Sequence, residues 1–290
     1  MLSKNSQTYM ACDRDYDEAE IVLFGAPFDS TTSNRPGARF ASRVMRAESW
    51  GLESYSPYQD LDLTESTRVC DLGDLELSFG ESGLALAQIE RTVEAILNDG
   101  KLPCMIGGEH LVTLGAVRAA ARRIPGLAVV HLDAHTDLRQ DYLGAELSHA
   151  TVMRRVYELL GEKSIFQFGI RSGEREEFLF AKAHLCTRLH DLKGIERLED
   201  ELSGRPVYLS IDLDVLDPSV FPGTGTPEPG GISYAQLQEA ILHLGRLNVI
   251  GFDLVELSPP YDPSGISAAC ACKALRELLL SLSKSAKAKQ

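Results

Sequence analysis

Short apolar runs of strand length alternate with segments of helical periodicity along most of this chain. The apolar runs are rich in Val, Ile and Leu and lie at Glu20–Gly25, Val69–Leu72, Pro103–Ile106, Leu127–Leu132, Ser164–Ile170, His184–Thr187, Pro206–Ile211 and Asn248–Leu254. The clearest helical segments are Glu81–Asn98, Leu111–Arg123, Ala150–Leu160, Ser233–Leu244 and Ser267–Leu282. Continuous apolar runs bounded by helices are typical of strands that are covered on both faces. The pattern therefore predicts a mainly parallel sheet between two layers of helices, a three-layer α/β/α fold.

The chain shows no sign of a boundary between domains. Its 290 residues contain no Ser/Gly-rich linker, no internal repeat and no shift in composition. We predict one domain over 1–290, with a short N-terminal extension at 1–19 and a frayed tail at about 283–290. Two stretches, Phe28–Phe40 and Pro218–Gly231, are rich in turn residues and lack periodicity. Loops of this length in a compact domain are often functional, so we expect surface loops that serve a site.

Composition and charge exclude several classes of partner. The net charge is −13, and we find no cluster of Lys and Arg of the kind that nucleic acid requires. An acidic field would attract a small cationic substrate, although solubility alone is the simpler explanation of the charge. No apolar stretch resembles a secretory signal or a membrane span, and the six Cys form no CxxC pair. These features predict a protein of the reducing cytoplasm.

Three short runs of candidate metal ligands each follow a predicted strand. His110 lies in Gly-Gly-Glu-His after the third strand, and Asp133, His135 and Asp137 lie in Asp-Ala-His-Thr-Asp after the fourth. Asp212 and Asp214, in Ile-Asp-Leu-Asp, close the seventh strand. Because ligands of open parallel sheets bind beyond the carboxyl ends of the strands, the three runs are expected to converge on one crevice.

The residue types in these runs favour a pair of divalent metal ions. In an extended backbone every second side chain points the same way, so Asp133, His135 and Asp137 would project together. Four carboxylates balance the charge of two divalent cations, and a metal pair activates water. Oxygen-rich sites with one or two imidazoles suit Mn²⁺ better than zinc. An isolated Asp-x-Asp is more often a turn or a helix cap, but the joint occurrence of three runs predicts metal binding. His131 shares the strand face of Asp133, and we interpret it as a packed neighbour of the ligands rather than a ligand.

The three motifs together resemble those of the ureohydrolase family, which includes arginases, agmatinases and formimidoglutamases. Residues 107–110, 133–137 and 210–218 match the family's metal motifs in order and context, and the likeness runs from about Phe24 to Leu279. The resemblance implies an arginase-like fold with an eight-stranded, mainly parallel sheet and two Mn²⁺ ions per subunit. It implies that one ion is held by His110, Asp133, Asp137 and Asp212, and the other by Asp133, His135, Asp212 and Asp214. Asp133 and Asp212 would bridge the two ions, and a hydroxide between them would attack a guanidinium carbon.

The resemblance also implies two residues that act on the substrate. Glu256, after the eighth strand, matches the position that orients the guanidinium group, a role that suits a carboxylate with paired hydrogen bonds. His149 matches a histidine thought to shuttle protons, and expelling an amine requires a proton donor. We therefore predict His149, Asp137 and Glu256 as catalytic. By themselves, Glu256 would be an ordinary carboxylate at a strand end and His149 a bystander, and Ala150 stands where the family commonly has Gly.

Within the family the chain is most similar to agmatinases, which implies hydrolysis of agmatine to putrescine and urea. The loop Leu138–Glu146 lacks the arginase pattern that binds an α-carboxylate and an α-amine, and Asn34–Phe40 and Gly223–Gly231 resemble agmatinase segments. Arg139 would repel the ammonium group of agmatine unless it turns outward and pairs with Asp141, which is the arrangement we expect. Otherwise guanidinobutyrate, arginine or formimidoglutamate remains as a substrate, and a catalytically silent metal-binding relative is a further alternative. The resemblance also implies a homo-oligomer, a trimer or a hexamer.

Overall fold

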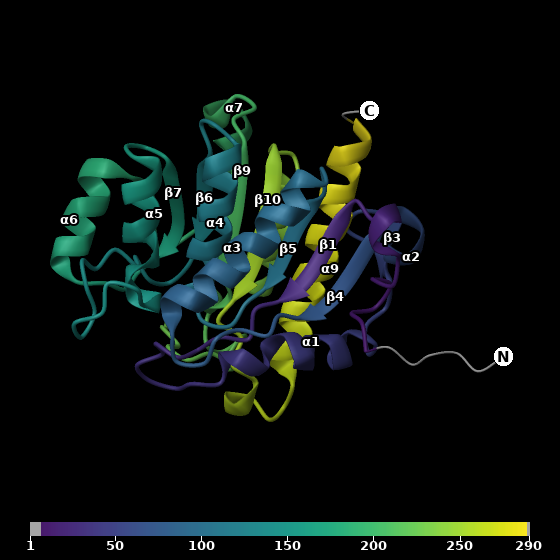
Figure 1. Ribbon diagram of the computed structural model, residues 1–290, viewed down its shortest axis with the longest axis horizontal. Coiled ribbons are helices and arrows are strands. Elements are labelled where there is room, and N and C mark those ends of the chain that lie inside the picture. The colour runs from purple at the N-terminus through teal and green to yellow at the C-terminus, as the bar shows by residue number, and fades with distance from the viewer. Residues whose placement is uncertain (1–6, 289–290) are drawn as a thin grey trace.

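The computed structural model describes residues 7–288, with side chains described as far as Ser283, and its centre is one sheet of eight strands (Figure 1). The strands are β1 Ile21–Gly25, β4 Val69–Asp74, β5 Leu102–Ile106, β6 Ala128–Leu132, β7 Ile165–Ile170, β8 Cys186–Leu189, β9 Val207–Asp212 and β10 Val249–Val255. Their order is β4-β1-β5-β10-β9-β6-β7-β8, and every neighbouring pair is parallel. Each of the eight apolar runs forms one strand, so the predicted fold class is confirmed.

Helices occupy most of the connections between the strands. They are α1 Ala41–Ser49, α2 Leu63–Ser66, α3 Ser82–Asn98, α4 Val112–Arg123, α5 Val152–Leu160, α6 Arg175–His184, α7 Leu198–Leu202, α8 Tyr234–Leu244 and α9 Ile266–Ala288. Short 3₁₀ turns lie at Tyr16–Glu18, Ala38–Phe40, His149–Thr151 (η3), Ile195–Arg197, Leu213–Val215 and Pro259–Tyr261. A small antiparallel pair, β2 Tyr55–Ser56 with β3 Leu61–Asp62, lies apart from the main sheet. The five predicted helical segments correspond to α3, α4, α5, α8 and α9.

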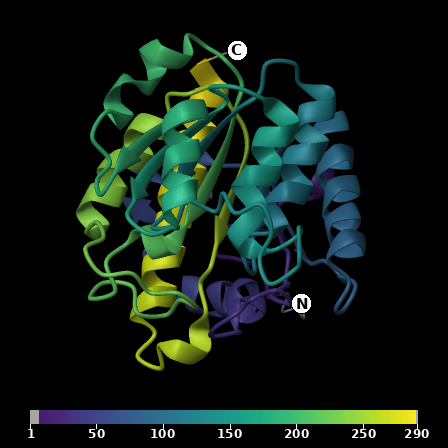
Figure 2. The ribbon, with the colours of Figure 1, turned by 90° about the vertical axis from the view of Figure 1, so that its left-hand side faces the viewer.

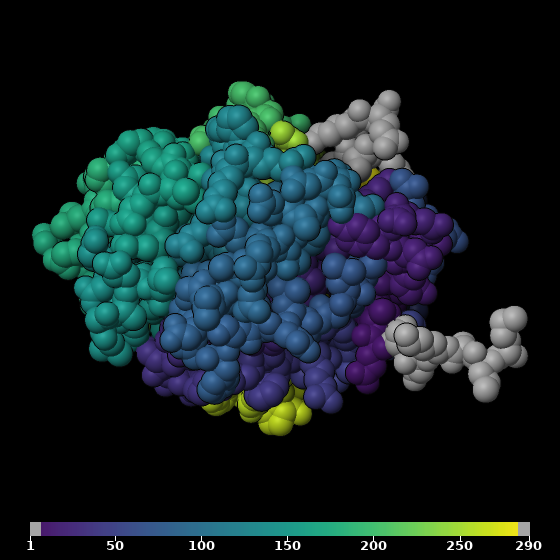
Figure 3. Space-filling view, viewed as in Figure 1, coloured from purple at the N-terminus to yellow at the C-terminus, as the bar shows by residue number. Residues whose placement is uncertain are grey.

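Successive residues of each central strand point into two different apolar cores. In β1, Ile21 and Leu23 join the core beneath α1, α7, α8 and α9, whereas Val22 and Phe24 join the core beneath α3, α4 and α5. Figure 2 shows helices on both sides of the sheet, and in Figure 3 the blue and teal atoms of α3 to α6 cover one face. Burial on both faces explains why these strands are continuous apolar runs rather than alternating ones.

The strand order brings the three metal-ligand runs together. The three runs follow strands β5, β6 and β9. In the sheet β9 lies beside β6, and β10 lies between β5 and β9, in the order β5-β10-β9-β6. The strands β5 and β6 are consecutive in the sequence but are separated in the sheet by β10 and β9. Such a change in strand order leaves a crevice at the carboxyl ends of these strands. Glu256 directly follows β10 and so reaches the same crevice.

The two predicted loops meet at this edge of the sheet. The side chain of Asn34 donates a hydrogen bond to the carbonyl oxygen of Gly225 at 3.2 Å. The first loop is folded around Asp29, whose carboxylate accepts the backbone N–H of Gly37 at 2.8 Å. Neither loop lies wholly on the surface, since Asp29 and Phe221 are both buried.

The two ends of the chain differ in how they pack. Within the predicted extension, Tyr9 is fully buried and its hydroxyl donates to the carbonyl oxygen of Cys272 at 2.6 Å. The backbone of α9 continues to Ala288, and the rest of the predicted frayed tail, like the side chains after Ser283, lies outside the described residues. In the described part of the chain, no helix is both long and apolar enough to cross a membrane.

Candidate metal centre

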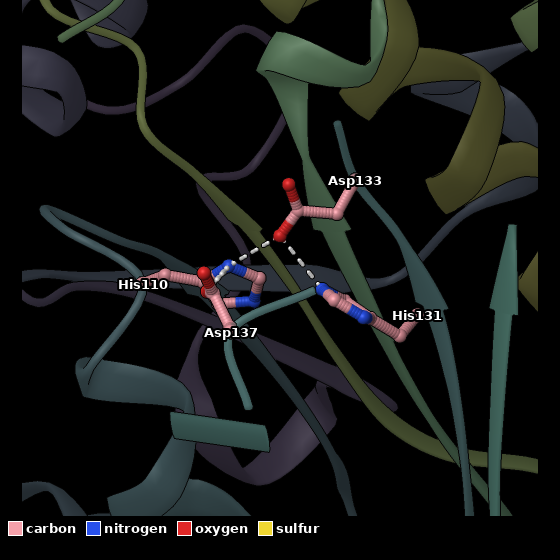
Figure 4. A group of neighbouring side chains, drawn as sticks. All are labelled: His110, His131, Asp133 and Asp137. Atoms are coloured by element: carbon pink, nitrogen blue, oxygen red, sulfur yellow. Dashed lines mark hydrogen bonds and ion pairs between the residues drawn. The ribbon is translucent and has the colours of Figure 1, made fainter. Parts of the chain in front are cut away.

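Three carboxylates from two strand ends converge on one nitrogen of His110. The Nδ1 atom of His110 lies 3.0 Å from Oδ2 of Asp133, 3.2 Å from Oδ2 of Asp137 and 3.2 Å from Oδ2 of Asp212. Figure 4 shows the carboxylates of Asp133 and Asp137 turned toward this ring. All four side chains are buried, yet Nδ1 has no hydrogen-bond partner among the described residues. A buried nitrogen that faces three carboxylate oxygens fits a cation between them.

A second group of ligands adjoins the first through Asp133. The Nδ1 atom of His135 lies 3.0 Å from Oδ2 of Asp214 and 3.5 Å from Oδ1 of Asp133. Asp133 thus presents one oxygen to each group, as a bridging ligand would. In both residues Oδ1 also accepts a backbone N–H, that of His135 at 2.5 Å for Asp133 and that of Asp214 at 2.8 Å for Asp212. Asp212, however, faces a histidine only through Oδ2, which lies near His110. The geometry therefore favours Asp133 as a bridge more strongly than Asp212.

The electrostatics of the first group indicate a surplus of negative charge. Burial and, after it, the charge of Asp133 raise the pKa of Asp137 to about 7. Burial and the charges of Asp214 and Asp133 raise the pKa of Asp212 well above its usual range. Burial alone would lower the pKa of His110, but its close contacts with the three carboxylates raise it well above the ordinary value. Each of these shifts is of the kind that a bound divalent cation would relieve.

His131 contacts the ligands as a hydrogen-bond donor. The side-chain nitrogen of Gln167 donates to the carbonyl oxygen of Thr136 at 2.9 Å, which fixes the orientation of the amide. The same nitrogen lies 3.1 Å from Nδ1 of His131, so Nδ1 must accept and Nε2 must carry the proton. That Nε2 lies 2.8 Å from Oδ2 of Asp133 (Figure 4). The interpretation of His131 as a packed neighbour of the ligands therefore agrees with its hydrogen bonds.

The two glycines of Gly-Gly-Glu-His are required by close packing. A Cβ atom on Gly108 would lie 1.9 Å from the carbonyl oxygen of Phe28, and one on Gly107 would lie 2.4 Å from the side chain of Val255. The Phe28 carbonyl instead accepts the backbone N–H of Glu109 at 2.8 Å. Gly108 therefore lets the loop at residues 26–37 lie against the start of α4, and Gly107 leaves room for Val255 of β10.

Glu256 stands beside His110 in an unusual backbone conformation. Its φ angle is +63°, a left-handed value that is rare for a residue other than Gly and Asn. Its Oε1 accepts the backbone N–H of His110 at 2.8 Å. Burial and, after it, the charges of Glu109 and Asp214 raise its pKa to about 8. Because Oε1 is engaged, Oε2 is the oxygen that remains for a ligand.

His149 begins η3 and lines the same cavity as Glu256. Its Nε2 lies 3.5 Å from the hydroxyl of Ser33, and its ring meets Tyr142 edge-on at 5.5 Å between centroids. Burial lowers its pKa to about 4. The sequence led us to expect a proton donor at this position, whereas burial favours the neutral ring. His149 would therefore have to gain a proton during a reaction before it could donate one.

The prediction that Arg139 turns outward and pairs with Asp141 is wrong. Arg139 lines the cavity, with Nη1 3.0 Å from Glu174 and Nε 3.6 Å from Glu177. Its guanidinium also stacks over the ring of Tyr142 at 4.7 Å. Both Glu residues come from the segment at the start of α6, far from Arg139 in the sequence, and sequence patterns did not single them out.

The ligand groups, Glu256 and His149 enclose a cavity of about 230 Å³. Its floor consists of metal-ligand candidates, and its outer wall carries Arg139, Glu174 and Tyr142. All the site residues predicted from the sequence except Asp133, which lies buried beneath its floor, line this cavity.

Comparison with known proteins agrees with this arrangement. The arginase family model matches residues 19–281. The chain belongs to the arginase family. Agmatinase of Bacillus subtilis is 44% identical over 97% of this chain and 98% of the relative. A human mitochondrial guanidino acid hydrolase is 36% identical over 91% of this chain and 79% of the relative. The agmatine ureohydrolase of Thermoplasma volcanium has a TM-score of 0.90 and 37% identity, with 99% of this chain and 98% of that chain covered.

In this member of the arginase family, the metal-free protein is expected to lose stability as pH rises, and bound metal is expected to suppress that loss. The pKa of Asp137 is raised to about 7 and that of Glu256 to about 8, so both carboxyls favour the folded state while protonated. That contribution is lost as pH rises through these values, and the raised pKa of His110 acts in the same direction. The lowered pKa of His149 has the opposite effect on stability, which it increases as pH rises, but only below about pH 6.5.

We therefore expect the melting temperature of chelator-treated protein to fall between pH 6 and pH 8.5 by at least about 5 °C, since about 1 kcal/mol shifts a domain of this size by 2–4 °C. Protein that is saturated with Mn²⁺ should change much less, because the bound cations neutralise the ionised carboxylates. Thermal unfolding at a series of pH values, with and without metal, measures both curves. A metal-free protein whose melting temperature rises over this interval would contradict the electrostatic account.

Proposed function

We propose that this chain hydrolyses the guanidinium group of agmatine to give putrescine and urea, with the help of two bound Mn²⁺ ions. The observation that carries the proposal is the union of two adjoining metal-ligand groups with the carboxylate of Glu256 on one cavity floor. The substrate predicted from the sequence is also the one named by curated relatives that are 44% identical over nearly the whole chain. Putrescine as product would give the enzyme a place in polyamine formation.

The residues of the cavity divide the work of this reaction. Glu256 holds the planar guanidinium cation through Oε2, while the backbone N–H of His110 keeps Oε1 in place. The metal pair, when bound, supplies Lewis acidity that activates water for attack on the guanidinium carbon. Neutral His149 takes up the proton that this attack releases and then donates it to the departing amine.

The charges of the outer wall favour a substrate with a cationic tail. Arg139 brings one positive charge, whereas Glu174 and Glu177 bring two negative charges within 4 Å of it. The carboxylates thus neutralise the guanidinium that would otherwise repel an ammonium group, and a negative charge is left in excess. This balance favours agmatine over guanidino acids such as guanidinobutyrate, which carry a carboxylate at that end.

The choice of metal and the setting of the enzyme rest on chemistry and family. Carboxylate oxygens with two imidazoles suit Mn²⁺, and Cys186 and Cys270, like the other Cys, contribute no ligand to either group. Six free thiols are suited to a reducing cytoplasm. The family resemblance supports a homo-oligomer, a trimer or a hexamer, and an acidic chain of net charge −13 is not suited to nucleic acid.

A substrate panel tests the proposal. Urea or amine release would be measured as kcat/KM for agmatine, arginine, 4-guanidinobutyrate and formimidoglutamate, with metal content determined on the same sample. We expect agmatine to be preferred by at least about 10²-fold, because a like charge placed beside Glu174 costs several kcal/mol. Activity should vanish with a chelator and return with Mn²⁺. Preference for guanidinobutyrate would transfer the function to guanidino acids, and a protein that binds two metals but hydrolyses none of the panel would be a silent relative.

A further inference from the structure

The loop at residues 26–37 is anchored on Glu109, a fully buried carboxylate next to His110. Thr31 makes two of the contacts, since its backbone N–H donates to Oε2 at 2.8 Å and its hydroxyl donates to Oε1. The hydroxyl of Thr32 donates to Oε2 at 3.2 Å. Both carboxylate oxygens are therefore used to hold this one turn of the loop.

Thr31 connects the buried carboxylate to His149. Its Oγ1 accepts the backbone N–H of His149 at 3.1 Å and lies 3.5 Å from Nδ1 of the same residue. A hydroxyl has one proton, and that of Thr31 is directed to Glu109. Oγ1 can therefore offer only lone pairs to His149, which favours a proton on Nδ1. The other ring nitrogen, Nε2, is then left without a proton and faces the cavity beside Ser33.

We propose that Glu109 and Thr31 are positioning residues that hold His149 in place, with its proton on Nδ1 and Nε2 free for proton transfer. The inference rests on the proposed function, in which His149 carries a proton to the departing amine. Thr31 thus affects the reaction by orienting His149, without contacting the substrate itself. The close approach that Gly108 allows between Phe28 and Glu109 keeps the loop where this contact can form.

Ser148 provides the competing arrangement. Its hydroxyl lies 3.3 Å from Nδ1 of His149 and caps η3 by accepting the backbone N–H of Thr151. The proton of Ser148 could therefore be donated to Nδ1, which would place the ring proton on Nε2 instead. The Thr31 and Ser148 arrangements require opposite tautomers, so they can be separated by experiment.

Three variants of the loop test the positioning role in the metal-loaded enzyme. Thr31→Val keeps the shape of the side chain but removes the hydroxyl, and we expect kcat for agmatine to fall by about 10-fold or more, since proton transfer contributes 10²–10⁴-fold. Thr31→Ser retains the hydroxyl and should restore kcat. Thr32→Val is the matched control. It removes a hydroxyl that donates to the same carboxylate, but this hydroxyl, unlike that of Thr31, makes no contact with His149. An equal loss in Thr31→Val and Thr32→Val would reduce Thr31 to a structural role and overturn the proposal.

A double-mutant cycle with His149→Ala separates this inference from the proposed function. His149→Ala should lower kcat while two metals remain bound, and adding Thr31→Val to it should cause no further loss. Additive losses would mean that Thr31 does not act through His149. Wild-type kcat in His149→Ala would instead remove the proposed proton carrier, and a wild-type protein inactive on the whole substrate panel would remove the proposed function itself.

The tautomer can be measured directly, without any loop variant. The chain contains 7 His, and comparison with His149→Ala assigns the ¹⁵N signals of His149 in protein loaded with diamagnetic Zn²⁺. The proposal requires the form protonated at Nδ1, changing toward the other form or a mixture in Thr31→Val. The form protonated at Nε2 in the wild-type protein would assign the contact to Ser148 and overturn the proposal, even if Thr31→Val failed to fold.

Discussion

Asp133→Ala is expected to abolish the binding of both metal ions and the release of urea. Asp133 is the residue common to the two ligand groups, with Oδ2 3.0 Å from Nδ1 of His110 and Oδ1 3.5 Å from Nδ1 of His135. Its carboxylate is also buried and keeps a lowered pKa, against the cost of burial, because of the neighbouring histidines. Losing it removes a ligand from each ion at once. We expect kcat/KM to fall by at least about 10³-fold, since metal activation supplies several kcal/mol.

Metal analysis of the purified variant, together with urea release from agmatine, measures this effect. Asp133→Asn preserves the shape of the side chain and guards against a loss that reflects misfolding, which circular dichroism would detect. Asp217→Asn is the matched control, because Asp217 belongs to the same motif as Asp212 and Asp214, but the donors to its carboxylate within residues 7–288 come from its own loop. Two equivalents of metal retained by both Asp133 variants would contradict its place between the ions.

Glu256→Gln is expected to lower kcat/KM for agmatine by about 10²-fold while metal content stays at the wild-type level. The variant can keep its Oε1 on the backbone N–H of His110, so the fold around the metal centre is preserved. The oxygen lost is Oε2, which is replaced by an N–H₂ group that cannot accept from a guanidinium. A hydrogen bond to a charged group contributes about 1.5–3 kcal/mol, and an unpaired buried donor adds to the loss.

The readouts for Glu256→Gln are KM, kcat and metal content measured on one preparation. Glu228→Gln is a suitable control, since it makes the same change in the neighbouring loop at a side chain that does not line the cavity. Residue 256 has a left-handed backbone conformation, and the change from Glu to Gln should leave it unchanged because only the end of the side chain differs. Unchanged kinetics in Glu256→Gln would remove this residue from the substrate site, whereas an equal loss of metal would assign it to the support of His110.

The strands could be predicted because each is buried on both faces. In the central strands nearly every residue joins one of the two cores, so an uninterrupted apolar run marks the strand within about two residues. The edge strand β8 was the least accurate, since the predicted His184–Thr187 became Cys186–Leu189 and His184 ends α6. An edge strand is partly exposed, and its apolar pattern is correspondingly weak. The helices α1, α2, α6 and α7 were not among the clear helical segments, and none of them is longer than 10 residues.

The candidate metal ligands could be named because their spacing is local, but their partners could not. Local sequence suggested Asp141 as the partner of Arg139, whereas the fold brings Glu174 and Glu177 from the start of α6. The contact between Thr31 and His149 joins residues 118 positions apart and left no local signal.

The sequence by itself determined the fold class, the family and the set of side chains able to bind metal, because hydrophobic periodicity and motif spacing are properties of short segments. Only the tertiary structure decided which oxygen of Asp133 faces which histidine, which charges surround Arg139, and how a buried carboxylate reaches His149. Those features depend on distances between segments that meet only when the order of the parallel strands places their carboxyl ends side by side.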